Sequence, residues 1–317
     1  MKKILICLVI VFSAAGLYAQ TYPDSRTDGK YYTINGAKLW VVSFGKGEPL
    51  FMLPGGPGNA HLYMRAFDTL SNAYTLVYFD GFGRGKSDTA ADVKEYSLKR
   101  DIADLEELRK AMGFAKINIL SHSYGTVVAQ GYAVKYPENV SHLLLLAPFH
   151  SYAMWQENDD NSNKEIRTNY PEVWDTLMII RKHGYRSSDS LHQAIYGRVP
   201  YGFLYAYNPD NFAHHKRNPY PHQMNTKLYY QMVGKDGDFK VSSDIGSFDY
   251  RKQLKDLKMP ILIVAGRYDH VAVPWMAVKY KKYCPQAKFV MFEKSGHNPY
   301  IEEPAKTFEL IRTFLSK

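Results

Sequence analysis

Short apolar runs alternate with helical patterns along much of the chain. Four runs in the first half have the length and continuous hydrophobicity of strands buried on both faces; they span 49–53, 74–80, 117–120 and 141–148. Two segments between them, 97–113 and 126–136, place apolar residues at helical spacing, and in the first of these Ser97 can cap the start and Gly113 the end. This alternation predicts an α/β fold, a mostly parallel sheet with helices on both faces.

The pattern is interrupted once before it resumes. Ahead of it, residues 30–36 and 38–45 predict paired strands joined by a tight turn at Asn35 and Gly36. Residues from about 150 to 250 are polar and rich in tyrosine, with a helical piece near 171–183 and no buried strand runs. The alternation returns afterwards with runs at 261–266 and 287–292 and helices at 274–283 and 303–315. We therefore expect a core divided over 20–149 and 251–317, with 150–250 inserted as a mainly helical cap.

The first 19 residues have the pattern of a secretory signal peptide. Lys2 and Lys3 precede an apolar stretch that ends in small residues, with Ala19 as the last residue before cleavage. The stretch is short for a membrane span of roughly 20 residues, so cleavage is favoured over an uncleaved anchor. Cleavage would leave Cys284 as the single cysteine and exclude an intramolecular disulfide. We expect an exported protein, periplasmic or secreted.

Charge restricts the partners that we expect. The net charge of +9 falls to +7 when Lys2 and Lys3 are removed with the signal. The positive residues are spread along the chain and form no block of the kind that binds nucleic acid. We expect no nucleic-acid partner and no stable membrane insertion after cleavage, whereas the oligomeric state stays open.

The clearest chemistry lies at the end of the strand at 117–120. The next residues, SHSYG (121–125), have the small-x-Ser-x-Gly pattern of a nucleophile elbow, which lifts the serine hydroxyl of Ser123 above a sheet edge. A serine nucleophile needs a base, and the base needs an orienting carboxylate. Asp269 and His297 each follow a later strand, and the order Ser123, Asp269, His297 is that of α/β-hydrolases. We expect these three catalytic residues at the carboxyl edge of the sheet.

A glycine-rich loop follows the strand at 49–53. Its sequence, LPGGPG (53–58), exposes backbone amides and keeps side chains away, as an oxyanion hole requires. One donor would be the N–H of Tyr124, next to the nucleophile, and the other the N–H of Gly56, with Gly55 as the second choice.

These motifs resemble those of one family. GGPG (55–58), DGFGRGKSD (80–88), SHSYG, AGRYDHVAVP (265–274) and SGHNPYIEEP (295–304), in this order, are similar to the proline iminopeptidase group of α/β-hydrolases. The resemblance covers nearly the whole mature chain and is weakest in the cap. Pro54 stands where the family typically has histidine, and 80–88 has altered spacing. The resemblance implies the α/β-hydrolase fold and a serine peptidase that releases N-terminal proline.

The family resemblance also implies an acidic residue in the cap that binds the free amine of the substrate. The segment MVGKDGDFKV (232–241) is similar to the family segment that carries one such acid, which assigns this role to Asp238. Glu157 and Glu172 are further candidates without a motif, and each of the three acids could equally be a solvated surface carboxylate. Five tyrosines of the insert could line an apolar pocket or form the core of the cap; they are Tyr201, Tyr205, Tyr207, Tyr229 and Tyr230.

We expect no metal and no cofactor. His214, His215 and His222 lie in the insert, but adjacent histidines alone do not define a metal geometry, and the chain has no HExxH motif or cysteine pair.

The predicted function is an exported serine hydrolase, an aminopeptidase that releases N-terminal proline or another small residue from short peptides through an acyl-enzyme. An alternative with the same chemistry is a carboxylesterase or other small-molecule hydrolase with a lid. A third possibility, a non-catalytic binding protein that retains the fold, is disfavoured because nucleophile, base, acid and oxyanion loop are all present.

Overall fold

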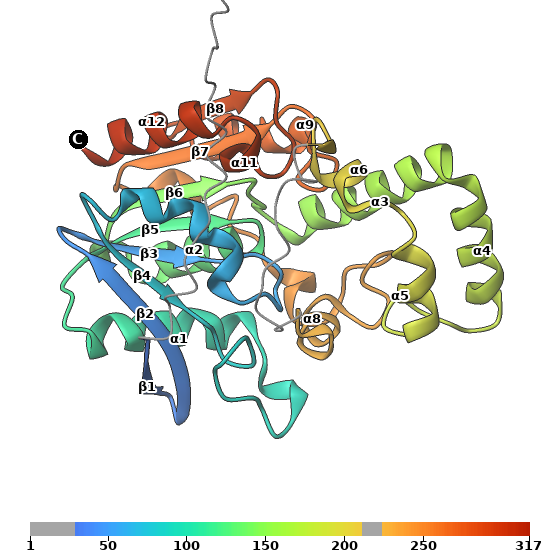
Figure 1. Cartoon of the computed structure of the whole chain (residues 1–317), viewed down its shortest axis with the longest axis horizontal. Helices are drawn as coiled ribbons and strands as arrows, with labels where there is room; N and C mark the ends of the chain where they lie inside the picture. The colour runs from blue at the N-terminus through green and yellow to red at the C-terminus, as the bar shows by residue number, and fades with distance from the viewer. Residues whose placement is uncertain (1–28, 211–223) are drawn as a thin grey trace, which may run out of the picture.

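The computed structural model describes residues 29–210 and 224–317, drawn in colour in Figure 1. The expected signal peptide and His214, His215 and His222 lie outside these residues. Eight strands form one sheet in the order β1-β2-β4-β3-β5-β6-β7-β8. The strands are β1 (Lys30–Ile34), β2 (Ala37–Gly45), β3 (Pro49–Leu53), β4 (Thr75–Phe79), β5 (Ile117–His122), β6 (Val140–Leu146), β7 (Ile261–Gly266) and β8 (Lys288–Phe292).

The sheet is mostly parallel, as the apolar runs predict. Only the pairs β1–β2 and β2–β4 are antiparallel. Asn35 and Gly36 turn the chain between β1 and β2 with φ of 46° and 83°, the left-handed values that a tight hairpin turn requires. The central strands β3, β5 and β7 are buried along their whole length, because helices cover both faces.

Each face of the sheet is covered by its own helices. Against one face pack α1 (Leu98–Ala111) and α2 (Tyr124–Lys135), which share a core with the residues of β3, β5 and β7 that point their way. Against the other pack the 3₁₀ helix η1 (His61–Leu70) and α12 (Pro304–Leu315). The side chain of Ser97 accepts a hydrogen bond from the Arg100 N–H and caps α1, as the sequence predicts.

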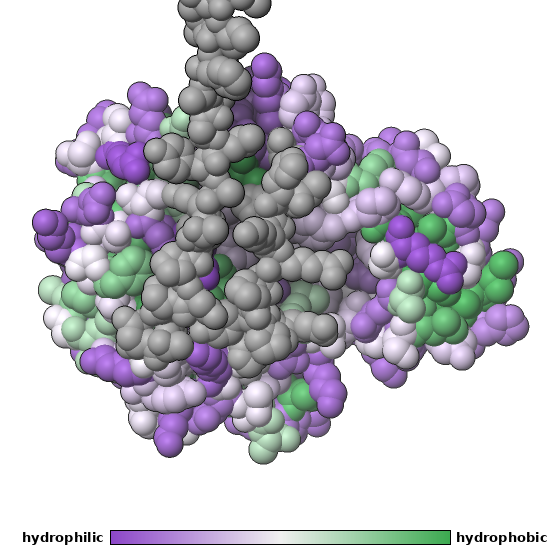
Figure 2. Space-filling model, in the orientation of Figure 1, coloured by the Kyte–Doolittle hydropathy of each residue, from purple (hydrophilic) through white to green (hydrophobic). Residues whose placement is uncertain are grey.

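The helical insert lies between β6 and β7 and projects from one side of the sheet (Figure 1). Its described helices are α3 (Tyr152–Asn169), α4 (Pro171–Lys182), α5 (Ser190–Tyr196), α6 (Tyr201–Tyr205) and α8 (Thr226–Val233). The cap has a small apolar core of its own, centred on Ile166, Leu177 and Ile195. Figure 2 shows apolar surface at its outer end. The exposed apolar side chains of the cap include Ile179 and Leu191. The expected α/β-hydrolase fold with a helical cap before the strand that precedes Asp269 is confirmed.

One expected helix is divided. The sequence predicts a single helix at 274–283, but the structure has α9 (Pro274–Ala277) and α10 (Tyr280–Tyr283). Between them the backbone hydrogen bonds span three residues, as in a 3₁₀ turn, since the N–H of Lys281 donates to the Val278 carbonyl. No helix within residues 29–210 and 224–317 combines the length and the hydrophobicity that a membrane span requires.

The central strand β6 should contribute strongly to stability. Leu144 is fully buried in it, so Leu144→Ala removes apolar contacts and leaves a cavity; we expect the free energy of unfolding to fall by about 2–5 kcal/mol. Leu191→Ala on the cap surface is the matched control and should change it by less than about 0.5 kcal/mol. Urea denaturation followed by circular dichroism measures both, and equal losses would contradict this account of the core.

Candidate active site

Ser123 occupies a strained turn between β5 and α2. Its φ of 55° and ψ of −127° lie outside the regions that non-glycine residues favour, which is the backbone state of a nucleophile elbow. The turn is closed by the N–H of Ser123, which donates to the Leu146 carbonyl at 3.0 Å. Gly125 must lack a side chain, because a Cβ there would lie 2.2 Å from the Leu53 carbonyl oxygen.

Ser121 stands where the elbow pattern usually has glycine. Its side chain is fully buried, and its hydroxyl donates to the Leu144 carbonyl of the neighbouring strand at 2.8 Å. The hydroxyl is thus satisfied without enlarging the turn, which explains how serine replaces glycine here.

Asp269 and His297 follow β7 and β8, and the structure brings their side chains together. The Nδ1 atom of His297 and Oδ2 of Asp269 are 2.8 Å apart, and both side chains are buried. The other carboxylate oxygen of Asp269 accepts the N–H groups of Val271 and Ala272 at 2.8 and 2.7 Å. These bonds hold the carboxylate in one orientation, and the imidazole with it.

His122, the residue before Ser123 in the chain, connects the nucleophile turn to His297. The Nε2 of His122 lies 2.9 Å from the His297 carbonyl oxygen, and the two imidazole rings are 4.8 Å apart. In the part of the chain that the structure describes, the Ser123 hydroxyl itself makes no hydrogen bond to His297. Hydrogen bonds between a nucleophile and its base commonly tighten when substrate binds.

The glycine-rich loop lies directly over Ser123. A Cβ on Gly55 would be 2.7 Å from the Ser123 Cβ, so this position must remain glycine. The N–H of Gly55 donates to the hydroxyl oxygen of Tyr63 and is therefore occupied. Gly56, with φ of 125°, and Tyr124, the first residue of α2, are left as the two candidate oxyanion donors, since the first N–H groups of a helix have no partner within it.

Arg84 fastens this loop to the elbow. Its Nε donates to the Pro57 carbonyl at 2.5 Å, and its two Nη atoms donate to the Asp101 carboxylate at 2.7 Å each. The Tyr124 hydroxyl donates to the same carboxylate at 2.6 Å. Arg84 is buried, and the charge of Asp101 helps to raise its pKa, so the guanidinium stays charged.

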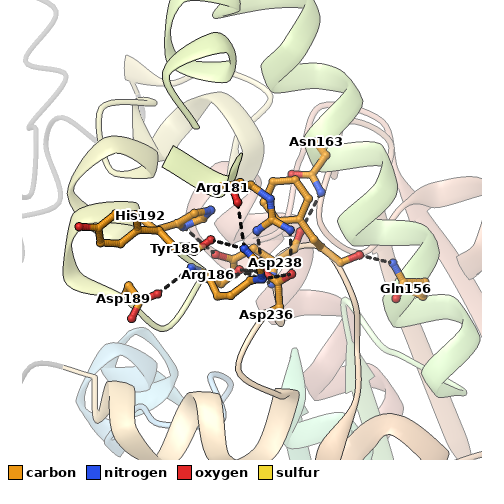
Figure 3. Close-up of polar contacts among 11 residues, drawn as sticks. Gln156, Asn163, Arg181, Tyr185, Arg186, Asp189, His192, Asp236 and Asp238 are labelled. Atoms are coloured by element: carbon orange, nitrogen blue, oxygen red, sulfur yellow. Dashed lines mark hydrogen bonds and ion pairs between the residues drawn. The ribbon is translucent and has the colours of Figure 1, made fainter. Parts of the chain in front are cut away.

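The cap places a group of acids beyond these residues. Asp238 lies at the centre of Figure 3, its side chain 16% exposed and its Oδ2 3.9 Å from the His192 Nδ1. Burial, together with the charge of Asp236, raises the pKa of Asp238 to about 6. Burial lowers the pKa of His192 to about 4, so the imidazole is neutral at neutral pH and supplies no positive charge.

A second acid, Asp159 on α3, accompanies Asp238. Its Oδ2 is buried and has no hydrogen-bond partner among the described residues. Burial raises its pKa well above the usual value, and the charges of Asp238 and Asp160 raise it further. The neighbouring Asn163 has a buried Oδ1 in the same unpartnered state within the described part of the chain.

Tyr205, in α6 of the cap, contacts the candidate base. Its ring packs edge-on against His297 with centroids 5.4 Å apart and stacks on Tyr201 at 4.2 Å. Burial raises the pKa of Tyr205 most, and the charges of Asp269, Asp238 and Asp159 raise it further. Both acids therefore lie within electrostatic reach of the residue that covers the candidate base.

The remaining candidates from the sequence are placed elsewhere. Glu157 is exposed and accepts a hydrogen bond from Trp275 at 3.3 Å, and Glu172 is exposed in the first turn of α4. Tyr229 and Tyr230 are half-buried near Asp238, whereas Tyr207 is exposed and packs on Tyr268. Within residues 29–210 and 224–317, no three histidine, cysteine or acidic side chains converge in a way that could hold a metal ion.

Comparison with known proteins agrees with this geometry. A protein-family model described as the alpha/beta hydrolase fold matches residues 48–195 and 203–304. The chain belongs to this family. A proline iminopeptidase of Heyndrickxia coagulans is 29% identical over 293 residues, which are 92% of this chain and 99% of that protein. A proline iminopeptidase of Saccharolobus solfataricus is 30% identical over 287 residues, 88% of each chain.

Solved structures share the hydrolase fold. A proline iminopeptidase of Mycobacterium smegmatis superposes with a TM-score of 0.73 at 19% identity, covering 91% of this chain and 97% of that one. VinJ superposes with a TM-score of 0.74 at 19% identity, covering 92% and 99%. The predicted resemblance is confirmed: the chain is a proline iminopeptidase-like serine hydrolase.

Three residues around the site of this hydrolase were not singled out by sequence reasoning. His122 is the variable position of the elbow motif, Tyr63 lies in the 3₁₀ helix η1, and Asp159 lies in a run of polar residues on α3. Of the three, only His122 could have been noticed in the sequence, since a large titratable side chain beside a candidate nucleophile must have a partner when it is buried.

The close approach of Gly125 to β3 makes a prediction for the hydrolase. Gly125→Ala would force the start of α2 away from the Leu53 carbonyl and displace Ser123, so we expect activity on p-nitrophenyl acetate to fall at least about 100-fold. Gly246→Ala is the control, since the nearest atom to its Cβ would be 3.8 Å away. Normal labelling of Gly125→Ala by a fluorophosphonate probe would contradict the packing described for this turn.

Proposed function

We propose that this hydrolase is an exported aminopeptidase that releases N-terminal proline, or another small residue, from short peptides. The observation that carries the proposal is the presence in the cap of two desolvated acids, Asp159 and Asp238, both of which act on the pKa of Tyr205, the residue that packs on His297. Carboxylates in such surroundings gain most from a cationic partner, because burial has removed the water that would otherwise stabilise their charge. The ammonium of a free N-terminus is that partner.

Proline fits this arrangement for a simple chemical reason. The charged secondary amine of an N-terminal proline carries two N–H bonds, and two carboxylates can accept one each. The relatives named proline iminopeptidase support the same substrate class. A peptide whose amine is acylated has no charge to offer and would leave the two acids unpaired.

In the proposed reaction the Ser123 hydroxyl attacks the carbonyl carbon of the first residue. Asp269 holds the Nδ1–H of His297, so the lone pair on Nε2 is free to take the serine proton. The oxyanion that forms would accept the N–H groups of Gly56 and Tyr124, each worth on the order of 3 kcal/mol of transition-state stabilisation. His297 then protonates the leaving amine, and water, activated by the same imidazole, hydrolyses the acyl-enzyme.

Export is the other part of the proposal, and it rests on the pattern of Lys2, Lys3 and the apolar stretch that follows. Its test is cell fractionation of the full chain against a Lys2→Glu, Lys3→Glu variant. We expect the wild type outside the cytoplasm and shortened by about 19 residues, as the signal pattern predicts. Retention of the full-length wild type in the cytoplasm would contradict export.

The triad makes the first prediction of this proposal. Purified mature protein should cleave a prolyl arylamide with a free amine and should cleave the N-acetylated compound at least about 100-fold more slowly, because only the former presents an ammonium. Ser123→Ala should fold normally and lose turnover of both. Equal cleavage of the two compounds would support the esterase alternative, and an active Ser123→Ala protein would overturn the mechanism.

The acid pair makes a second prediction, which concerns KM. Asp238→Asn should raise the KM for the prolyl arylamide about 10-fold or more and leave hydrolysis of p-nitrophenyl acetate unchanged, because the ester needs no anionic partner. Glu157→Gln, a change of an exposed acid on the same helix as Asp159, is the control and should have no effect.

The pH dependence follows from the raised pKa of Asp238, about 6. Below this pH the carboxyl group is protonated and cannot attract the ammonium, so KM for the free amine should rise as the pH falls through 6. The ester serves as the reference, because its KM has no such dependence while both substrates share His297. A KM ratio that stays constant between pH 5 and 8 would exclude Asp238 from amine binding.

A further inference from the structure

Four groups form a continuous hydrogen-bonded chain beneath the active site. The Gly55 N–H contacts the Tyr63 hydroxyl, this hydroxyl lies 3.1 Å from the His122 Nδ1, and the His122 Nε2 lies 2.9 Å from the His297 carbonyl. The chain thus begins in the oxyanion loop and ends on the residue that carries the candidate base. Neither Tyr63 nor His122 belongs to the triad or the oxyanion hole.

The direction of every bond in the chain is determined by its last member. The His297 carbonyl can only accept, so the His122 Nε2 must carry a hydrogen and donate it. Burial lowers the pKa of His122 to about 3, so the ring is neutral and its Nδ1 is an acceptor. The Tyr63 hydroxyl must therefore donate to Nδ1, which leaves its oxygen lone pairs for the Gly55 N–H.

We propose that Tyr63 and His122 are positioning residues that fix the oxyanion loop against the loop carrying His297. The proposal rests on the proposed function only in that Ser123 and His297 are taken as nucleophile and base. Gly56 is held from both sides: Tyr63 holds the N–H of the residue before it, and Arg84 holds the carbonyl of Pro57 after it. The direction of the Gly56 N–H then depends on both anchors.

The neutral state of His122 is part of this role. Its ring lies 4.8 Å from that of His297, where a positive charge would oppose protonation of the base during the reaction. The ring is enclosed edge-on by Tyr63 and Tyr300, with centroid distances of 5.7 and 5.5 Å, and is almost fully buried. The titratable groups that face the His122 ring are Tyr63, Tyr300 and His297. Asp269, the partner of His297, is the acid whose charge acts on the pKa of His122. His122 therefore helps to position His297 without placing a charge beside it.

The test compares Tyr63→Phe with Tyr280→Phe in the full mature chain. Tyr280 is a matched control, because it is fully buried and its hydroxyl donates one hydrogen bond, to Gln130 at 2.9 Å, outside the site. We expect Tyr63→Phe to lower kcat about 10- to 100-fold with KM changed less than about 3-fold, because a displaced oxyanion donor weakens the transition state and not the bound substrate. Tyr280→Phe should lower stability alone.

Two further readouts separate positioning from general damage. A boronic acid that mimics the tetrahedral intermediate should bind Tyr63→Phe more weakly by about the same factor as kcat/KM falls, while the affinity for free proline is unchanged. His122→Phe keeps a ring of similar size but removes both the acceptor for the Tyr63 hydroxyl and the donor for the His297 carbonyl. The loss of kcat in the double variant should therefore be no larger than that of the worse single variant.

The outcomes also distinguish this proposal from the proposed function. All rates are measured with p-nitrophenyl acetate as well as the prolyl arylamide, so a protein that cleaves only the ester disproves the aminopeptidase and still tests Tyr63. The positioning role is overturned if Tyr63→Phe keeps the wild-type kcat on the ester. It is also overturned if the boronate affinity of Tyr63→Phe is unchanged, or if the losses of Tyr63→Phe and His122→Phe simply multiply.

Discussion

The active site depends on the strained backbone of Ser123. A residue with φ of 55° and ψ of −127° keeps this conformation only where its surroundings leave no alternative. Here a strand buried along its length enters the turn, and a helix buried along most of its length leaves it. Gly125 allows that helix to start against the Leu53 carbonyl. The packing of β5 and α2 thus offsets the conformational free energy of the strained residue, and the reaction does not change that packing.

The groups that serve this serine are fixed by hydrogen bonds between loops that are distant in sequence. Asp269 takes its orientation from backbone N–H groups that follow it, and the glycine-rich loop takes its own from Arg84 and Tyr63. Pro54 fits this arrangement, since proline has no N–H to satisfy at the end of a buried strand.

The parts of the structure that could be predicted from the sequence are those with local signals. A strand buried on both faces is mostly apolar, so β3, β5, β6 and β7 could be predicted, and the residues that follow parallel strands must meet at one sheet edge. The partner of His122 is a carbonyl 175 residues away, which no local pattern encodes. Asp159 and the exposed Asp160 are adjacent, and only the fold distinguishes the buried carboxylate from the solvated one. The break between α9 and α10 likewise follows from tightened turns that helical spacing does not show.

The distribution of charge in the cap explains how Asp238 differs from Asp236, two residues earlier. Arg181 forms two hydrogen bonds with Asp236, at 2.6 and 2.7 Å, which lower the pKa of that carboxyl, and the guanidinium also lies over the Phe239 ring. Arg181 is thereby committed to Asp236, and the neighbour of Asp238 on the other side, His192, is neutral. For Asp238, burial outweighs the hydrogen bonds from Ser187 and Tyr230 and the charge of Arg181, so its pKa is raised to about 6. The hydrogen bonds of one arginine thus distinguish two nearby carboxyl groups, one with a lowered pKa and one with a raised pKa.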